Sequence, residues 1–289
     1  MVRHVSRWKP CKIRVFVMQL SKFLPAPIRR WVRKRLTIYV YTYGFRPSPK
    51  IEEQTLTFSF GERRFGVKAN YRTALYDMIA EVADYDCYQL KKLSFRPDKQ
   101  NYFVDIGANV GVTAIVLSQF PNAHVSCYEP DPENCVLLRE NVNLNSLTNV
   151  KVFEAAVGSE NGKLTFQTHG ESTGGHLLTD DSGSNGTEAG AEMVTVDTVT
   201  LERAIAQTGS LEIDLLKCDC EGGEYALIDQ ITPELAARIR NLTIEIHDLD
   251  QRRNVKTISD KLANLGYEIS IIPDMWERGA LHLLLAQRR

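Results

Sequence analysis

Short apolar segments alternate with amphipathic ones along the chain after residue 100. Seven of them have the length and composition of buried strands: residues 102–108, 124–130, 150–158, 213–219, 242–248, 267–274 and 281–287. Between them, Asp131, Pro132 and Glu133 provide a helix N-cap, a proline in the first helical position and an acid in the first turn. A stripe of apolar residues at helical spacing within 255–265 ends at Gly266, a residue type that often terminates helices. Repeated strand–helix units predict an α/β fold with a mostly parallel sheet covered by helices on both faces.

A hairpin and a helix are predicted before this region. Residues 55–69 form two alternating segments around Gly61, Glu62 and Arg63, the pattern of a β-hairpin. One helical stripe follows, and its apolar members are Leu75, Met78, Ile79 and Val82. We therefore expect a basic arm, a hairpin-and-helix cap and a main domain, at residues 1–50, 51–100 and 101–289. Residues 169–192 are rich in Gly, Ser and Thr and predict a mobile loop of the kind that often carries function.

The net charge of −1 conceals a strong asymmetry. Residues 1–50 contain 13 Lys and Arg and no Asp or Glu, which leaves 22 basic and 36 acidic side chains in the rest of the chain. Residues 24–44 mix apolar and Arg-rich positions in the manner of an amphipathic helix that lies on an anionic surface, such as lipid headgroups. A helix packed on the domain with its charges in water explains the same pattern. An acid-poor, Arg-rich start also resembles an organelle transit peptide, which the scarcity of serine disfavours.

Composition limits the class of protein further. With 43% hydrophobic and 9% aromatic residues the chain can bury a sizeable core. Its six cysteines are scattered without disulfide-rich spacing, which favours a reduced, cytoplasmic protein. No apolar run reaches the ~18 residues of a membrane-spanning helix. Residues 13–20 are apolar but lack the cleavage signal of a secretory peptide. Any contact with the inner face of a membrane is expected to be peripheral and made by residues 1–50.

The strongest local signal is VDIGANVGVTA, residues 104–114. A buried strand ends in Asp105, and Gly107 and Gly111 then frame a tight turn into an apolar helix, because glycine lets the backbone turn sharply beside a ligand. The spacing differs from G-x-G-x-x-G, which seats a pyrophosphate on a helix N-terminus, and an acid at the strand end would repel a pyrophosphate. An ammonium or sulfonium group suits this acid better. A nicotinamide-dependent oxidoreductase is therefore disfavoured.

A second acid stands at the end of the next strand. Glu129 follows Gly111 by 18 residues, within CYEPDP. An acid at this place can accept hydrogen bonds from the 2′- and 3′-hydroxyls of a ribose. Glu129 could instead be a solvated strand-end charge, but its combination with Asp105 and the glycine turn favours a binding role.

Five blocks in order, VDIGANVG, YEPDPEN, AAVG, TVDTVTLE and LLKCDCEGGE, resemble those of the FkbM family of S-adenosylmethionine-dependent O-methyltransferases. The resemblance spans residues 101–247 and leaves out the first hundred. It implies a Rossmann-like class I methyltransferase fold with a seven-stranded sheet, and S-adenosyl-L-methionine as the cofactor. The residues that it places around the cofactor are Asp105, Gly107, Asn109 and Gly111 at the methionine part, Glu129 at the ribose, Ala156 or Val157 near the adenine, and Asp219 beside the transferred methyl.

Residues 217–224, KCDCEGGE, combine two cysteines with several acids. In a strand, Cys218 and Cys220 share one face, whereas Lys217, Asp219 and Glu221 share the other. A C-x-C pair could join a metal site, but no second Cys/His pair lies nearby in the sequence. We therefore expect both cysteines to pack as apolar side chains. The resemblance places this block beside the transferred methyl, which implies that its acids act in catalysis rather than in a metal clamp.

Methyl transfer to a hydroxyl needs in-line attack and removal of the hydroxyl proton. The candidate bases are Asp219, Glu221, His247 and, in the glycine-rich loop, His176. Histidine suits the task because its pKa is near neutral, although a strand-end histidine such as His247 is often structural. Glu245, on the same strand face, is placed to orient His247 or Lys217. A Mg²⁺ ion held by Asp219 and Glu221 is a further alternative.

We therefore expect an O-methyltransferase that acts on a hydroxyl of a sugar, of a glycan- or lipid-linked molecule or of a natural product, an acceptor class that only the resemblance implies. One alternative is a module that binds S-adenosylmethionine without turnover, and another is a methyltransferase for a macromolecule. A nucleic-acid substrate is disfavoured because the chain after residue 50 carries a formal charge balance of −14.

Overall fold

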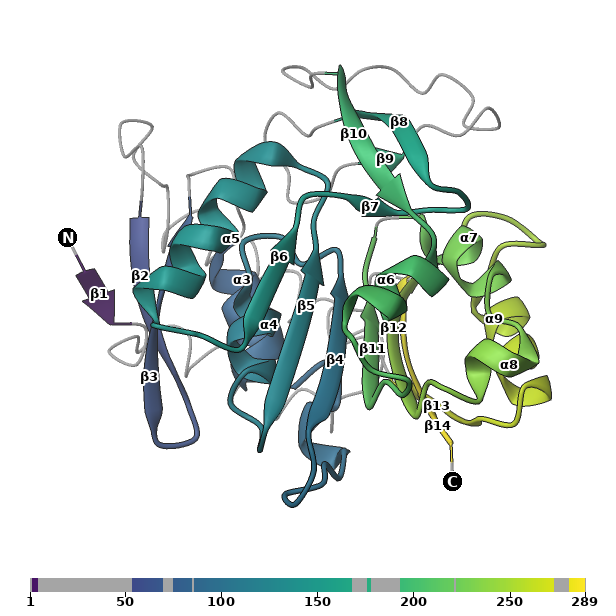
Figure 1. Ribbon diagram of the computed structural model, residues 1–289, viewed down its shortest axis with the longest axis horizontal. Coiled ribbons are helices and arrows are strands. Elements are labelled where there is room, and N and C mark those ends of the chain that lie inside the picture. Colours follow the sequence, from purple (N-terminus) through teal and green to yellow (C-terminus); the bar gives the residue numbers. More distant parts are fainter. Residues whose placement is uncertain are drawn as a thin grey trace, which may run out of the picture.

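The computed structural model describes residues 2–4, 54–69, 75–84, 86–167, 176–177, 193–220, 222–272 and 281–288. A seven-stranded sheet with the order β13-β14-β12-β11-β4-β5-β6 forms its centre (Figure 1). Its strands are β4 (Asn101–Ile106), β5 (Ala123–Tyr128), β6 (Val150–Phe153), β11 (Leu215–Cys218), β12 (Asn241–His247), β13 (Glu268–Ile272) and β14 (Leu281–Gln287). Neighbouring strands are parallel except for β14, which is antiparallel to both β12 and β13. The predicted mostly parallel, seven-stranded sheet is confirmed.

Helices cover both faces of this sheet (Figure 1). One face carries α4 (Val112–Leu117) and α5 (Pro132–Leu144), and the other carries α6 (Leu201–Gln207), α7 (Glu224–Asp229), α8 (Pro233–Ala236) and α9 (Val255–Asn264). Alternation along β4 serves the two cores, since Phe103 packs on the α4 side and Val104 packs on the α6 side. No helix in the described part of the chain has the length and apolar character to cross a membrane.

The predicted helix ends are confirmed. The Asp131 carboxylate accepts hydrogen bonds from the backbone N–H groups of Glu133 and Asn134, and Pro132 opens α5. Gly266 follows α9 with a φ of 89°, a value that favours glycine. These caps position α5 at the end of β5 and α9 beside β13.

The strand order has a switch point between β4 and β11. The chain adds β5 and β6 on one side of β4, then crosses to add β11 and β12 on the other side. Connections that follow β4 and β11 therefore leave the sheet in opposite directions. In open α/β sheets the crevice at such a point, outside the carboxyl ends of the strands, is where ligands bind.

The expectation of one strand over residues 150–158 is wrong. Strand β6 ends where Phe153 pairs with Tyr128, the last residue of β5, so the next residues have no partner in the main sheet. They form β7 (Ala156–Val157) instead, which pairs with β10 (Met193–Val199) in a smaller sheet. The other strands of this sheet are β8 (Gly162–Gln167) and β9 (His176–Leu177).

The cap begins with the predicted hairpin, which is confirmed. Strands β2 (Gln54–Phe60) and β3 (Arg63–Ala69) are antiparallel, and β1 (Val2–His4) pairs with β2 in parallel. The remaining elements of the cap are α3 (Leu75–Ile79), the π-helical segment η3 (Ala80–Asp84) and the 3₁₀ helix η4 (Leu90–Lys92). Apart from residues 2–4 and 176–177, the basic arm (1–50) and the glycine-rich loop (169–192) lie outside the described residues, so both stay predictions.

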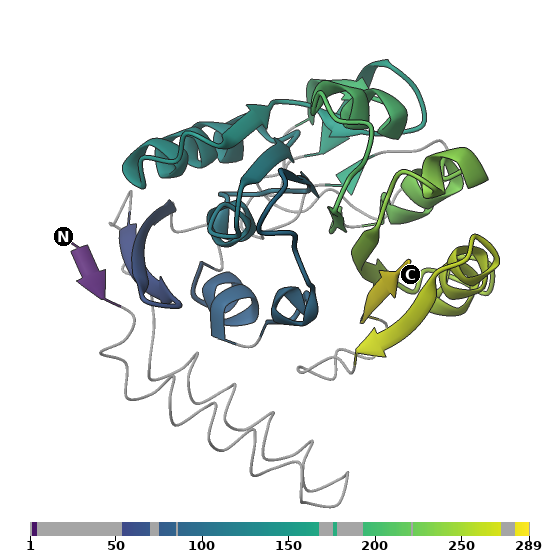
Figure 2. The same ribbon diagram turned by 60° about the horizontal axis from the view of Figure 1, so that its bottom comes forward.

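Asn141 of α5 and Asn145, the C-cap residue that follows this helix, hold the hairpin on the main domain, and Figure 2 shows the hairpin beside the helix. The Asn141 side chain accepts a hydrogen bond from the N–H of Lys68 (2.6 Å) and donates to the C=O of Lys68 (2.9 Å). Asn145 makes the same pair of bonds to Gly66 (2.9 and 2.7 Å). Residues four apart on a helix are separated by nearly the same distance as residues two apart on a strand. The two side-chain amides can therefore bond to alternate residues of β3, as the backbone of a neighbouring strand would.

Replacement of Asn141 by alanine should destabilise this junction. Asn141 is fully buried and also donates to the C=O of Val110 in the β4–α4 loop (2.8 Å), so the substitution leaves several backbone groups unpaired. We expect Asn141→Ala to lower the free energy of unfolding by about 3 kcal/mol, measured by urea denaturation. Asn143→Ala, at an exposed position of the same helix, is the control and should change it little. Equal stability of the two variants would contradict this account of cap docking.

Candidate active site

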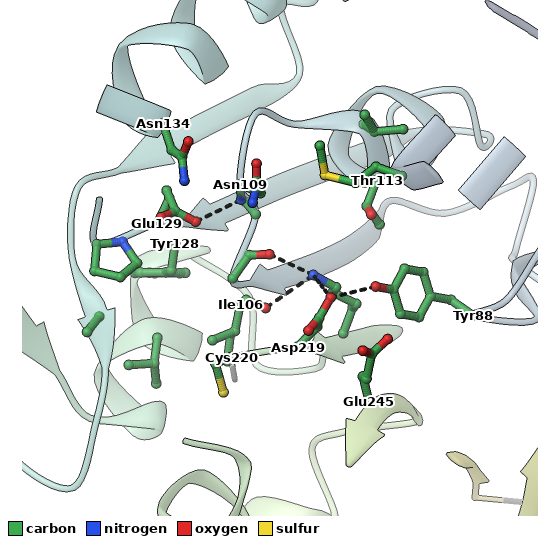
Figure 3. A pocket seen from close by; sticks show the side chains of 18 of the residues that line it. Tyr88, Ile106, Asn109, Thr113, Tyr128, Glu129, Asn134, Asp219, Cys220 and Glu245 are labelled. Carbon is green, nitrogen blue, oxygen red and sulfur yellow. Dashed lines mark hydrogen bonds and ion pairs between the residues drawn. The ribbon is translucent and has the colours of Figure 1, made fainter. Parts of the chain in front are cut away.

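A pocket lies at the switch point, between the carboxyl ends of the central strands and the cap. Its lining residues from the main sheet and the loops that follow it include Gly107, Asn109, Tyr128, Glu129, Lys217, Asp219 and Glu245, and α4 adds Thr113. The cap adds Met78, Glu81, Val82 and Tyr88, and β7, β8 and α5 add Ala156, Val157, Phe166 and Asn134. Figure 3 shows Glu129 and Asn109 on one side of the site and Tyr88 on the other, with Asp219 between them.

The loop after β4 needs glycine for a steric reason. Gly107 has a φ of 72°, and a Cβ at this residue would lie 1.7 Å from the backbone oxygen of Asp219. The loops after β4 and β11 therefore touch, backbone against backbone. Gly111 has a φ of 91° and a Cβ there would lie 2.3 Å from Cδ1 of Leu138. Gly107 lines the pocket, whereas Gly111 packs α4 against α5 and is not part of the lining.

Glu129 ties this loop to the end of β5. Its Oε2 accepts a hydrogen bond from the backbone N–H of Asn109 (2.7 Å), and its Oε1 accepts one from the N–H of Asp131 (3.0 Å). The side chain is buried but lines the pocket. Burial raises the pKa of Glu129 to about 7, although the two backbone hydrogen bonds oppose the shift. The carboxyl group thus titrates near neutral pH, at the place predicted for a ribose.

Lys217 is a buried cation at the centre of the sheet. Its Nζ lies 3.1 Å from Oδ1 of Asp105 and 3.7 Å from Oδ2 of Asp219, and it donates a hydrogen bond to the C=O of Gly107 (2.7 Å). Burial lowers the pKa of Lys217, but the negative charges of Asp105 and Asp219 outweigh burial and raise it above the usual lysine value. Lys217 is therefore charged, and its hydrogen bond to Gly107 holds the backbone of the glycine loop in place.

Asp105 lies behind the pocket wall rather than in it. It is fully buried and is not a lining residue. Alternation along β4 and β11 points Asp105 and Lys217 to the same face of the sheet, where they pair. The direct contact predicted between Asp105 and the methionine part of a cofactor stays a prediction. The visible contribution of Asp105 is to hold Lys217.

Asp219 stands at the meeting point of β11, the glycine loop and the cap. The hydroxyl of Tyr88 donates a hydrogen bond to its Oδ2 (2.7 Å), and the Tyr88 ring lies 5.4 Å from Nζ of Lys217. Asp219 and Tyr88 both line the pocket, so the cap closes one wall of the site.

His247 is held by Glu224, a residue that the sequence did not single out. Oε1 of Glu224 accepts the backbone N–H of His247 (2.8 Å) and lies 3.1 Å from its Nδ1. Nε2 of His247 lies 4.0 Å from Glu245. His247 is not a lining residue, whereas Glu245 is. Glu221 lies outside the described residues, and for His176 only the backbone in β9 is described.

Of the two cysteines on either side of Asp219, Cys218 packs as predicted, whereas Cys220 is half-buried and also lines the pocket. Cys218 is fully buried in the core on the α6 side, and its Sγ lies 3.3 Å from the Sγ of Cys220. No group of three or more His, Cys, Asp or Glu side chains in the described segments is arranged to hold a metal ion.

Comparison with known proteins identifies the family. The model of the methyltransferase FkbM domain matches residues 105–269, which is more than half of the chain. The chain belongs to the FkbM methyltransferase family. It is therefore a methyltransferase, and the pocket at the switch point is its candidate active site.

Curated relatives of the enzyme are distant. Methyltransferase sdnD of Sordaria araneosa is 25% identical over 228 residues, which are 70% of this chain and 86% of that protein. The 31-O-demethyl-FK506 methyltransferase FkbM of Streptomyces tacrolimicus is 27% identical over 57% of this chain and 71% of that protein. The 2-O-methyltransferase NoeI of Sinorhizobium fredii (strain NBRC 101917 / NGR234) is 28% identical over 48% of this chain and 60% of that protein.

Among solved structures, the methyltransferase FkbM from Methylobacillus flagellatus KT is similar over 68% of this chain and 46% of that chain. The sequence identity is 16% and the TM-score is 0.46.

Five of the cofactor residues predicted from the sequence line this pocket: Gly107, Asn109, Glu129, Ala156 and Asp219. Sequence reasoning missed Tyr88 and Glu224, and it did not recognise the central position of Lys217. A lysine inside the apolar strand LLKC was a usable signal for Lys217, because a buried lysine needs a partner. For Tyr88 no local signal exists, since its partner is 131 residues away.

Removal of the buried cation tests this reading of the site. Lys217→Met retains most of the length of the side chain but leaves Asp105 buried without its partner. We expect the free energy of unfolding to fall by roughly 3–5 kcal/mol, measured by chemical denaturation at pH 7. The double variant Asp105→Asn, Lys217→Met removes both charges and should recover part of the loss. A double variant no more stable than Lys217→Met would refute the view that the unpaired charge causes the defect.

Proposed function

We propose that the enzyme binds S-adenosylmethionine in the pocket at the switch point and transfers its methyl group to a hydroxyl of a sugar, a glycan- or lipid-linked molecule or a natural product. The observation that carries the proposal is the setting of Glu129. It is a buried carboxylate that lines the pocket at the end of β5 and grips the glycine loop through the N–H of Asn109. Each carboxylate oxygen can accept more than one hydrogen bond, so both retain capacity for the hydroxyls of a ribose.

The other lining residues fit the remaining parts of the cofactor. Beside Glu129, the pocket wall is apolar, which suits the flat face of an adenine: Tyr128, Ala156, Val157 and Phe166. On the other side, Gly107 lines the pocket with its backbone, which the methionine part can approach. The positions of these lining residues support the ribose, adenine and methionine sites expected from the sequence.

Two acids are the nearest candidates to act on the acceptor. When bound, S-adenosylmethionine supplies an electrophilic methyl group, and the protein must align a hydroxyl with it and receive the hydroxyl proton. Asp219 and Glu245 line the pocket, so either can accept the hydrogen bond of an acceptor hydroxyl. His247 lies behind Glu245, with Nδ1 held by Glu224 and Nε2 directed at Glu245. In this arrangement His247 acts through Glu245 rather than by contact with the acceptor.

The hydroxyl as acceptor is supported by the names of two relatives, a 2-O-methyltransferase and a 31-O-demethyl-FK506 methyltransferase. The proposal includes a peripheral contact of the basic residues 1–50 with an anionic membrane surface, supported by their charge. Incubation of cell extract with isotopically labelled S-adenosylmethionine, followed by mass spectrometry, identifies the molecule that gains the labelled methyl group. A label found only on nitrogen or carbon would contradict O-methylation.

Loss of the Glu129 carboxylate should weaken cofactor binding. Glu129→Gln replaces one acceptor oxygen by an NH₂ group that faces a backbone N–H. We expect the dissociation constant for S-adenosylmethionine to rise at least tenfold, or about 1.4 kcal/mol, measured by isothermal titration calorimetry. The control is Glu202→Gln, at an exposed position of α6, which should bind as the wild type does. If Glu129→Gln also retained full affinity, the ribose assignment would be wrong.

Cofactor binding should also depend on pH. With a pKa of about 7, Glu129 is mostly protonated at pH 6 and mostly ionised at pH 8, and ribose hydroxyls donate best to the ionised form. The charged neighbour Asp131 favours protonation, and hydrogen bonds from the backbone N–H groups of Asp131 and Asn109 oppose it. We expect the affinity for S-adenosylmethionine to rise by roughly tenfold between pH 6 and pH 8. Glu129→Gln corrects for titration of the ligand itself, so an identical pH profile in this variant would exclude Glu129 as the cause.

The raised pKa of Glu129 also affects the stability of the unliganded protein, in the opposite direction: stability falls as the pH rises. Because the folded-state pKa of Glu129 is raised above the ordinary glutamate value of 4.5, the native state binds more protons than the unfolded state between pH 4.5 and about pH 7. This contribution to stability is complete below pH 4.5 and is lost as the pH rises through 7.

A further inference from the structure

The cap directs one aromatic side chain into the pocket by an unusual backbone path. The π-helical segment η3 is followed by Asp86 with a φ of 53° and Gln89 with a φ of 55°, on either side of Cys87 and Tyr88. Positive φ is rare and costly for residues other than glycine, and such residues gather at functional sites. The Asp86 carboxylate stabilises the turn, since it accepts the backbone N–H groups of Leu90 (2.7 Å) and Lys91 (3.1 Å). The result is that Tyr88 is buried against the main domain.

Tyr88 contacts two charged residues of the site at once. Its hydroxyl donates to Oδ2 of Asp219 (2.7 Å), and its ring covers the Lys217 ammonium at 5.4 Å. Lys217 itself lies 3.7 Å from the same oxygen of Asp219. Within the described segments, no hydrogen bond reaches Oδ1 of Asp219. Because the Asp219 side chain is 24% exposed and lines the pocket, Oδ1 is the oxygen that a ligand can meet.

The charges of this cluster do not balance. With both carboxyl groups ionised, Asp105, Lys217 and Asp219 carry two negative charges and one positive charge, and although burial raises the pKa of Asp105, the charge of Lys217 opposes that shift. Tyr88 adds none, because burial raises its pKa well above 10 and keeps the hydroxyl protonated as a donor. A ligand group with one positive charge would complete the cluster. The methyl donor of the proposed function offers two such groups, a sulfonium and an ammonium.

We propose that Tyr88 is a positioning residue of the methyltransferase site. By holding Oδ2 of Asp219 and covering Lys217, it directs Oδ1 of Asp219 toward a positively charged group of the methyl donor. The cap is therefore part of the donor site as well as a wall of the pocket. This inference rests on the proposed function, because the positively charged ligand is S-adenosylmethionine.

Tyr88→Phe in the full chain tests the inference with little change in packing. It removes the hydroxyl and keeps the ring over Lys217. We expect the dissociation constant for S-adenosylmethionine, measured by calorimetry, to rise about tenfold. In an Asp219→Ala background the same substitution should have no further effect, because Tyr88 acts through Asp219. The matched control is Tyr267→Phe, which removes hydrogen bonds to the C=O groups of Ala236 and Ile239 in the core. It should lower the melting temperature without a change in affinity.

Titration with S-adenosylhomocysteine, which lacks the sulfonium charge, separates the two cationic groups. A larger loss of affinity for S-adenosylmethionine in Tyr88→Phe assigns Oδ1 to the sulfonium, and an equal loss for both ligands assigns it to the ammonium. Wild-type affinity in Tyr88→Phe, or a tenfold loss that persists in the Asp219→Ala background, would overturn the positioning role alone. A wild-type protein that binds neither ligand would overturn the proposed function together with it.

Discussion

The ion pair between Lys217 and Asp105 is the interaction on which the site depends. A charged lysine in the middle of a parallel sheet is costly to desolvate and is tolerated only when each of its protons finds a partner. Here the partners are Asp105, the C=O of Gly107 and, at longer range, Asp219. These groups come from β4, from the loop after β4 and from the end of β11. The need to satisfy one cation therefore fixes the relative positions of the two strands that flank the switch point.

The cap depends on polar contacts of a different kind. Asn141 and Asn145 present amides to the edge of β3 as a neighbouring strand would, and Asn141 also bonds to Val110 after the glycine loop. A covered edge cannot pair with another chain, and the same contacts fix the hairpin relative to the pocket. The cap then reaches the other side of the pocket through Tyr88. Contacts at both ends of the cap thus converge on the loops after β4 and β11.

Local pattern explains which parts of this structure could be predicted. Strands of the main sheet, the N-cap Asp131, the turn at Gly61 and the end of α9 at Gly266 all follow from residues close together in sequence. The division of residues 150–158 between two sheets does not, because it depends on where β5 ends. The pairing of Lys217 with Asp105 is equally non-local, since it follows from the adjacency of β4 and β11. For the same reason, Glu224 as the partner of His247 could not be read from the chain.

Asp105 and Asp219, the acids at the ends of β4 and β11, have different surroundings, although the sequence predicted that both would lie beside the cofactor. An acid after β4 was expected to meet a cationic ligand, yet the charge of Asp105 is already opposed by Lys217 at 3.1 Å. Lys217 lies farther from Asp219, at 3.7 Å, and Asp219 lines the pocket. Asp105 therefore holds the backbone of the loop after β4 through Lys217 and Gly107, and Asp219 is the acid of the pair that lines the pocket. The sequence could not predict this difference between the two acids, because it depends on the pairing of β4 with β11, two strands that are more than a hundred residues apart.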